Sequence, residues 1–405
     1  MDRAPRLTEL SEEQQQLAMR LGSGYRVIKG VAGSGKTVVL VARVRLLASE
    51  NPEMHFGIFC FNNALSKMLT RRLSGLANIT VATIDSFASR ECSARKLKIT
   101  ATGSERFEQQ AEIALQSATS TGGTTIQFDA VFVDEAQDLD AKRLGLAFAS
   151  LKDPDGDFVI SYDTAQLTKP SSEVTRWTPP GGRTARGRTK LMRINYRNTQ
   201  EVLQHAYYFL RRGESVVDNN DEPLDPDAIA HPLSSRSGSK TRTLEFDSLH
   251  SAVDAICEEV RSVVHAGERP DRIALIVGNQ TARTAIYKRM QAIGLEPGQY
   301  VDLSFGNARA SLAKAEGRAH GASFHKLKGL EYKHVYLLGL DNIEPESSKL
   351  SAIADFERLR RLVYTAMTRS SHHLTIALHG DSEMVTELRE VQARLEAYFS
   401  GQAQS

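Results

Sequence analysis

Residues 30–37 read GVAGSGKT, a glycine-rich turn that ends in Gly35, Lys36 and Thr37. The stretch fits the pattern GxxxxGK(S/T), in which backbone N–H groups surround a triphosphate, the lysine reaches the outer phosphates and the hydroxyl ligates magnesium. Its flanks agree, because residues 26–29 predict a strand and residues 37–47 a helix whose positive end faces a bound anion. We therefore predict a site for ATP and Mg²⁺. The loop residues expected to form it are Gly30, Ala32, Gly33, Ser34, Gly35, Lys36 and Thr37.

The bulk properties of the chain indicate a two-domain α/β protein. Its 405 residues exceed what one hydrophobic core usually supports. Short apolar runs alternate with amphipathic stretches throughout, a pattern typical of α/β folds. The 51 Lys and Arg nearly balance the 49 Asp and Glu, so the net charge neither requires nor excludes a nucleic-acid partner.

Cysteine usage and hydropathy bear on the cellular compartment. The three cysteines, Cys60, Cys92 and Cys257, lie far apart without metal-ligand or CxxC spacing, which suits a reducing cytoplasm and indicates no structural zinc. Residues 1–16 are polar, and no apolar run approaches the roughly 18 residues needed to span a bilayer. We therefore expect a cytoplasmic protein without a membrane segment.

A second motif, FDAVFVDEAQD at residues 128–138, reads as an apolar strand that ends in two acids. An acid at the C-terminal end of a parallel strand beside the phosphate loop can hold magnesium, and the next acid can orient and deprotonate the attacking water. We assign Asp134 to magnesium and Glu135 to the general base. The alternative is that both acids merely end a strand.

Together with the loop, DEAQD (residues 134–138) resembles the superfamily 1 helicases of the UvrD/Rep type. Further motifs of that family follow in order. LSEEQ (10–14) is similar to the family's glutamine motif, which implies that Gln14 reads the adenine edge. SYDTAQ (161–166) stands where the family has GDDDQ, which implies that Gln166 lies near the terminal phosphate.

Three more segments resemble motifs of the family. INYR (residues 194–197) resembles QNYR, which implies that Tyr196 stacks on adenine and that Arg197 contacts the γ-phosphate. FCFNNALSKM (59–68) and VATIDSF (81–87) resemble segments that touch the single strand in relatives. The resemblance therefore implies single-stranded DNA as a partner.

The second half of the chain carries the most specific motifs. SFHKLKGLEY (323–332) is similar to the family's T-x-H-x-x-KGLEF segment, and LVYTAMTR (362–369) to its L-x-Y-V-x-x-TR segment. By that resemblance Glu331 lies near the ribose and Arg369 is the arginine finger. An arginine that reaches the nucleotide when two domains close neutralises charge on the transferred phosphoryl group, which is worth ~10³ to 10⁵ in rate.

The resemblance also implies the fold. Relatives consist of two tandem RecA-like P-loop domains with parallel sheets and ATP in the interdomain cleft, and we expect the same here. Prolines and glycines in residues 179–188 predict a boundary. We expect an N-terminal ATP-binding domain over residues 1–189, with a reduced insertion near 90–127. A C-terminal domain over 190–405 would carry the arginine finger.

Two departures from the family leave the function open. The large accessory insertions are missing, and Gln166 is followed by LTKPSS where relatives have aromatic rings that stack on bases. The leading hypothesis is an ATPase coupled to single-stranded DNA binding and translocation. The alternative is an ATP-driven switch subunit of a repair or anti-phage complex, in which a partner nuclease acts on DNA.

A few aromatic residues could replace the missing stacking rings. Trp177 is either a displaced stacking platform or, more often for such a residue, a cover for the domain edge. Phe61, Phe87 and Phe324 fall in segments that face DNA in relatives, but core packing explains each equally well. Asp85 occupies a position where the family usually has histidine, which argues against a strong DNA contact there.

Overall fold

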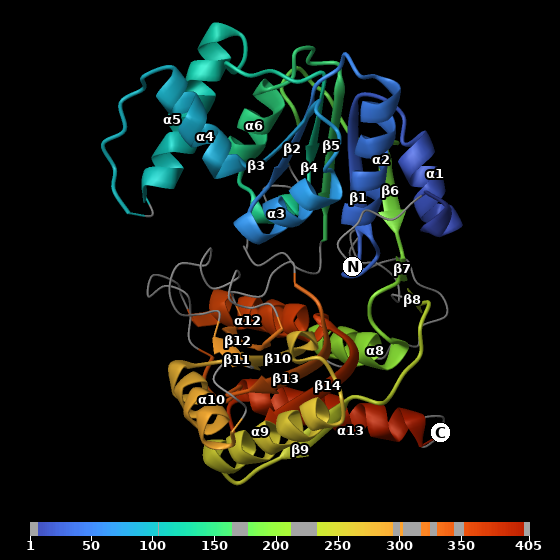
Figure 1. The fold of residues 1–405 in the computed structure, drawn as a ribbon, viewed down its shortest axis with the longest axis vertical. Coiled ribbons are helices and arrows are strands. Elements are labelled where there is room, and N and C mark those ends of the chain that lie inside the picture. The colour runs from blue at the N-terminus through green and yellow to red at the C-terminus, as the bar shows by residue number, and fades with distance from the viewer. Residues whose placement is uncertain are drawn as a thin grey trace. The chain divides into compact units, whose positions relative to one another are not determined.

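The computed structural model describes residues 7–103, 105–163, 177–211, 233–294, 300–302, 317–324, 330–343 and 352–400. The chain divides into two units, Met1–Arg193 and Ile194–Ser405. Each unit contains one six-stranded sheet (Figure 1). Each sheet is parallel throughout, which confirms the predicted α/β class.

The first sheet has the strand order β3-β2-β4-β5-β1-β6. Its central strands are nearly continuous apolar runs because both of their faces are covered. β6, by contrast, is an edge strand with three exposed residues. The strands are β1 (Tyr25–Gly30), β2 (Phe56–Cys60), β3 (Ile79–Thr83), β4 (Ala130–Val133), β5 (Asp157–Tyr162) and β6 (Thr189–Met192).

Helices cover both faces of the first sheet. Apolar residues of α4, α5 and α6 form one core cluster against it, and those of α2 and α3 form a second. Figure 1 shows α4, α5 and α6 grouped together, apart from α1 and α2. The helices are α1 (Glu12–Arg20), α2 (Lys36–Glu50), α3 (Asn63–Arg72), α4 (Ile84–Ala94), α5 (Glu105–Thr121) and α6 (Ala141–Ala149).

The second sheet has the order β11-β12-β10-β13-β14-β9. Its strand β10 lies between β12 and β13, and all five of its residues are buried. A separate parallel pair, β7 and β8, precedes this sheet. The strands are β7 (Ile194–Asn195), β8 (Leu233–Ser234), β9 (Arg242–Glu245), β10 (Ile273–Val277), β11 (Tyr300–Asp302), β12 (Ala319–Ser323), β13 (Tyr332–Leu338) and β14 (Ser370–Leu378).

The helices of the second unit form two groups. α9 and α10 bury their apolar residues against β10 and β13, whereas α8 contacts α12 and α13. The fully buried Arg360 joins the last two helices, because its guanidinium pairs with Glu357 and Glu387. The helices are α8 (Gln200–Leu210), α9 (Leu249–His265), α10 (Gln280–Ala292), α12 (Ala352–Met367) and α13 (Glu383–Phe399).

The division between the units lies slightly beyond the expected one. We expected the second domain to begin at residue 190, but β6 pairs with β1 and so belongs to the first sheet. The first unit accordingly extends to Arg193. The expected reduced insertion, residues 90–127, contains the end of α4 and all of α5.

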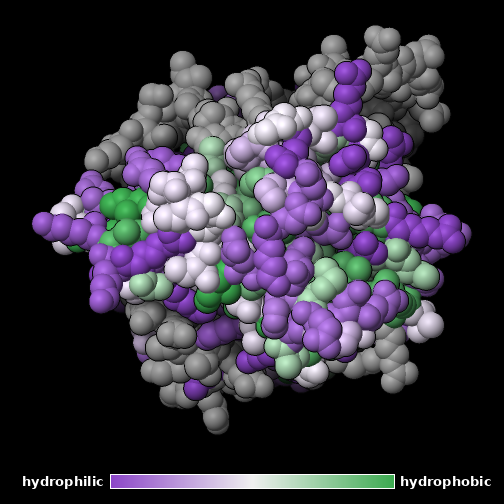
Figure 2. All heavy atoms as spheres, turned by 90° about the horizontal axis from the view of Figure 1, so that it is seen from above, coloured by the Kyte–Doolittle hydropathy of each residue, from purple (hydrophilic) through white to green (hydrophobic). Residues whose placement is uncertain are grey.

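The surface in the view of Figure 2 is mostly hydrophilic, with hydrophobic side chains scattered rather than gathered in one patch. None of the helices in the described ranges is long and apolar enough to cross a membrane. Large hydrophobic residues that are exposed are Met19, Phe61, Phe107, Ile126, Leu191 and Tyr287.

Candidate nucleotide site

The glycine-rich turn connects β1 to α2, as its pattern predicts. Gly33 and Gly35 have φ angles of 73° and 88°, a left-handed conformation that glycine adopts without a Cβ clash. A Cβ on Gly35 would lie 2.3 Å from Nε2 of Gln14. α2 begins directly afterwards at Lys36, so the free N–H groups of its first turn border the loop, the arrangement that binds anions.

The ammonium group of Lys36 lies within the curve of this loop. It is 6% exposed and donates hydrogen bonds to the carbonyl oxygens of Gly30 at 2.9 Å and Val31 at 3.1 Å. Its Nζ is also 3.9 Å from Oδ2 of Asp163. The charge is therefore held by the loop backbone and by an acid at the end of β5.

Thr37 and Asp134 meet although they are far apart in the sequence. Thr37 Oγ1 donates to Asp134 Oδ2 at 2.7 Å, and Ser161 Oγ donates to Asp134 Oδ1 at 2.5 Å. Burial, followed by the charge of Glu135, raises the pKa of Asp134 to about 6. A hydroxyl and a carboxylate are oxygen donors of the kind that Mg²⁺ prefers, so these side chains fit the predicted ion.

Glu135 has a backbone conformation that is unusual for a non-glycine residue. Its φ of 53° and ψ of 45° are left-handed, and such residues cluster at functional sites. Gln137 fixes its carboxylate: Nε2 donates to Glu135, and Oε1 accepts from the backbone N–H of Asp163 at 3.2 Å. The Glu135 side chain is therefore held in place. Its role as the general base stays a prediction.

Gln14 connects the first helix to the phosphate loop. Its Nε2 donates to the carbonyl oxygen of Ser34 at 3.1 Å, and its Oε1 accepts from the N–H of Ser11 at 3.2 Å. Ser11 also caps α1 through the N–H of Gln14. The structure places Gln14 beside the loop, and its contact with adenine stays a prediction.

Three predicted residues of the second unit also come together. Arg197 Nε lies 2.9 Å from Oε2 of Glu331, and Arg369 Nη1 donates to the carbonyl oxygen of Leu330 at 3.4 Å. Arg369 is only 4% exposed. Tyr196 is half-buried on the same turn as Arg197. The ribose, adenine and phosphate contacts predicted for these residues stay predictions.

The predicted residues thus fall into one group in each unit. The first unit assembles the loop with Gln14, Asp134 and Glu135, and the second assembles Arg197, Glu331 and Arg369 with the turn of Tyr196. Gln166 lies outside the described residues. Three further residues of the first group, Gln137, Ser161 and Asp163, were not predicted. Ser161 and Asp163 lie at the carboxyl end of β5. Gln137 lies in the short helical turn Ala136–Asp138 that follows β4.

The aromatic candidates for nucleic-acid stacking are mostly part of the protein core. Phe87 and Phe324 are each 3% exposed. Trp177 packs against the core cluster, with its ring 5.8 Å from that of Phe158 and 6.1 Å from that of Tyr25. Phe61, directly after β2, is 41% exposed and is the remaining aromatic candidate of the four.

Asp85, for which no strong DNA contact was expected, has a partner within the protein. Arg143 of α6 donates through Nε to its Oδ1 at 2.7 Å. The same guanidinium also pairs with Glu108 of α5 and with Asp140. Asp85 therefore helps to join α4, α5 and α6.

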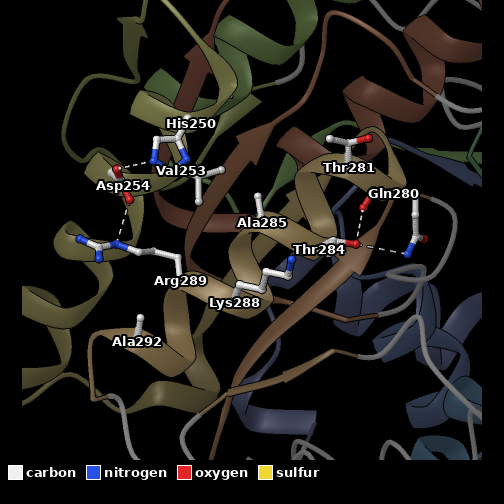
Figure 3. A pocket seen from close by; sticks show the side chains of 10 residues that line it. All are labelled: His250, Val253, Asp254, Gln280, Thr281, Thr284, Ala285, Lys288, Arg289 and Ala292. Atoms are coloured by element: carbon white, nitrogen blue, oxygen red, sulfur yellow. Dashed lines mark hydrogen bonds and ion pairs between the residues drawn. The ribbon is translucent and has the colours of Figure 1, made fainter.

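A separate groove of about 660 Å³ lies between α9 and α10 (Figure 3). Asp254 of α9 joins the two helices, because its Oδ1 lies 2.9 Å from Nε of Arg289 in α10. Its Oδ2 lies 3.4 Å from Nε2 of His250. Its lining mixes both signs of charge with threonine and glutamine side chains. Of the predicted nucleotide residues that the structure describes, none lines this groove.

The strand, loop and helix, with Thr37 facing Asp134, define a P-loop nucleoside triphosphatase. Comparison with protein families gives two matches, to the AAA domain over residues 9–215 and to the UvrD-like helicase C-terminal domain over residues 319–377. The first match spans about half of the chain. The chain therefore belongs to the AAA-domain family and, with its second match, to the UvrD/Rep-like superfamily 1 helicases.

The two matches also confirm the expected architecture. Two parallel sheets, a P-loop domain and a helicase C-terminal domain fit two tandem RecA-like domains. A comparison with curated proteins found no match. The chain is thus assigned as a helicase-type P-loop ATPase through its domains.

Proposed function

We propose that this protein hydrolyses ATP in response to single-stranded DNA and uses the cycle to move along the strand. The observation that carries the proposal is the 2.7 Å contact between Thr37 and Asp134, beside the buried Lys36. These residue types supply a hydroxyl, a carboxylate and an ammonium for a magnesium nucleotide. The UvrD-like C-terminal domain supports a nucleic acid as the effector.

In this proposal the first unit binds the nucleotide and prepares the water. Lys36 contacts the outer phosphates, while Thr37 and Asp134 would hold Mg²⁺, which when bound neutralises charge on the β- and γ-oxygens. Glu135 orients and deprotonates the attacking water. Gln14 contacts the adenine edge and Gln166 lies near the terminal phosphate. Backbone contacts come from Gly30, Ala32, Gly33, Ser34 and Gly35.

The second unit supplies the residues that respond to closure of the cleft. Arg197 and Arg369 approach the γ-phosphate, Tyr196 stacks on adenine and Glu331 lies near the ribose. Because the arginines act fully only when the two domains close around ATP, hydrolysis and product release would reopen the cleft and advance the strand. Within the second unit, Arg197 pairs with Glu331, and Arg369 donates to the carbonyl oxygen of the neighbouring Leu330.

The test is ATP turnover with and without a single-stranded oligonucleotide. We expect stimulation of many-fold in the parent and loss of turnover in Lys36→Ala. Lys142→Ala is the matched control, since Lys142 is an exposed lysine that pairs with Glu112 on the helix surface. Equal turnover in K36A and K142A would contradict the proposed site.

The packing of the aromatic residues favours a second candidate, an ATP-driven switch subunit. Phe87, Phe324 and Trp177 are taken up by core packing, which leaves few rings to stack on bases. In that case a partner nuclease acts on DNA within a repair or anti-phage complex. Flat ATP turnover with DNA, restored by the product of a neighbouring gene, would support the switch over the translocase.

Cytoplasmic localisation is part of the proposal. All three cysteines, Cys60, Cys92 and Cys257, are unpaired and buried, which suits a reducing compartment.

A further inference from the structure

Two asparagines form a buried hydrogen-bonded pair beside the turn that carries Arg197. Asn195 and Asn198 are both 0% exposed. Oδ1 of Asn195 accepts from the N–H groups of Arg197 and Asn198, each at 2.8 Å. Its Nδ2 donates to Oδ1 of Asn198 at 2.7 Å. The pair therefore fixes the backbone on both sides of Arg197.

The other end of the Asn198 amide reaches the arginine-finger segment. Its Nδ2 donates to the carbonyl oxygen of Thr368 at 2.9 Å and to that of Ser370 at 2.5 Å. These are the two carbonyls that flank Arg369. Since carbonyl oxygens only accept hydrogen bonds, the NH₂ group must face them, and the orientation of the amide is fixed.

The amide of Asn198 thus holds the backbone on both sides of Arg369. Arg369 Nη1 donates to Leu330 at the long distance of 3.4 Å, whereas both neighbouring carbonyls are tied to Asn198. Loss of the amide would leave two buried carbonyl acceptors without this donor, which is unfavourable until another donor replaces it. The turn would then shift to find new partners.

We propose that Asn198 is a positioning residue, which holds the turn of Arg369 in register with the turn of Arg197 for phosphoryl transfer. The inference rests on the proposed function, because it assumes that both arginines act on ATP. A shift of about 1 Å in a catalytic group can cost 10²-fold in rate. Asn198 follows directly after INYR, residues 194–197, the segment that carries Arg197.

The test is a double-mutant cycle on ATP turnover. Asn198→Ala should lower kcat by about 10- to 100-fold and change KM for ATP by less than about 3-fold, since the arginine acts chiefly in the transition state. In the Arg369→Ala background, N198A should lower kcat by a clearly smaller factor than in the parent, and the remaining effect would act through Arg197. A merely structural role would lower kcat by the same factor in both backgrounds.

Asn279→Ala is the matched control. Asn279 is also buried in the second unit, and its Nδ2 donates to the carbonyls of Gly339 and Asn342. These lie just beyond Leu338, the end of β13 opposite to Glu331. N279A should lower the melting temperature about as much as N198A while it keeps the parent kcat.

Asn198→Ser covers the case in which N198A does not fold. Its hydroxyl can donate to one of the two carbonyls, so its kcat should lie between the parent and R369A. Folded N198A or N198S with the parent kcat, or effects that multiply with R369A, would overturn the inference. A parent protein without ATP turnover would instead contradict the proposed function itself, and the role of Asn198 with it.

Discussion

At the scale of single residues, the candidate chemistry depends on side chains that are held before any substrate binds. Lys36 is fixed by two loop carbonyls, Thr37 by Asp134, and Glu135 by Gln137. Such preorganisation reduces what must be rearranged when charge develops in the reaction. The left-handed backbone of Glu135 aims its carboxylate at the cost of local strain.

The role of Glu135 leads to a direct prediction. Glu135→Gln keeps the shape of the side chain and removes its basicity, so turnover should fall by about 10²- to 10⁴-fold while ATP still binds. Steady-state ATP hydrolysis and equilibrium binding of a fluorescent ATP analogue measure the two effects. Glu53→Gln, at an exposed glutamate, is the control. If E135Q hydrolysed ATP at the same rate as E53Q, the result would favour the alternative hypothesis, in which Asp134 and Glu135 merely end a strand.

The buried His205 should make the free energy of unfolding depend on pH. Burial lowers the pKa of His205 in α8 to about 4, whereas an unfolded histidine titrates near 6.5. Between these values the unfolded chain binds the extra proton. The free energy of unfolding should therefore fall as the pH is lowered below 6.5, by about 2 kcal/mol between pH 7 and pH 5.

Denaturant unfolding at several pH values measures this loss. His205→Gln should flatten the dependence between pH 7 and pH 5. An unchanged slope in H205Q would show that His205 does not contribute.

At the scale of elements, one arginine joins the three helices that pack on one face of the first sheet. Arg143 is 5% exposed and pairs with Asp85, Glu108 and Asp140. Removing one partner of a buried ion pair leaves uncompensated charge, which costs about 3–5 kcal/mol.

Arg143→Ala should therefore lower the free energy of unfolding by several kcal/mol. Lys142→Ala, at the neighbouring exposed residue, should change it by less than about 1 kcal/mol. Chemical denaturation of both variants makes the comparison. Equal stability of R143A and K142A would mean that the pairs at Arg143 add nothing.

The elements near the phosphate loop could be predicted because their signals are local. The apolar run, the glycines and the helix follow one another within residues 25–50, and DEAQD directly follows β4. The contacts of Ser161 and Asp163 could not be predicted in this way. They depend on β5 lying between β4 and β1, which is a property of the sheet order and not of any short segment.

The contacts of Asn198 were hidden for the same reason. Its amide meets residues 368 and 370, and no sequence pattern relates these distant positions. Asp85 did give a signal, since it differs from the family at that position, but its partner Arg143 could not be named from the sequence. The motifs thus predict the candidate site residues. They do not predict the hydrogen-bond and ion-pair partners that hold those residues in place.

At the scale of the whole molecule, each of the two RecA-like domains contains one group of candidate residues. The resemblance predicted this division, and the two parallel sheets and the family matches confirm the architecture. The expected boundary between residues 189 and 190 falls within β6, an exposed edge strand that lacks the apolar pattern of a buried strand. The coupling of the two groups through ATP is the central claim of the proposed function.

The measurement that tests this claim most directly is ATP turnover by Arg369→Ala with saturating single-stranded DNA. Arg389→Ala is the matched control, since Arg389 pairs with Glu245 and Asp381 on the surface of the second unit. We predict a loss of at least ~10³-fold for R369A with R389A at the parent rate. An R369A rate within a few-fold of the parent would contradict the account.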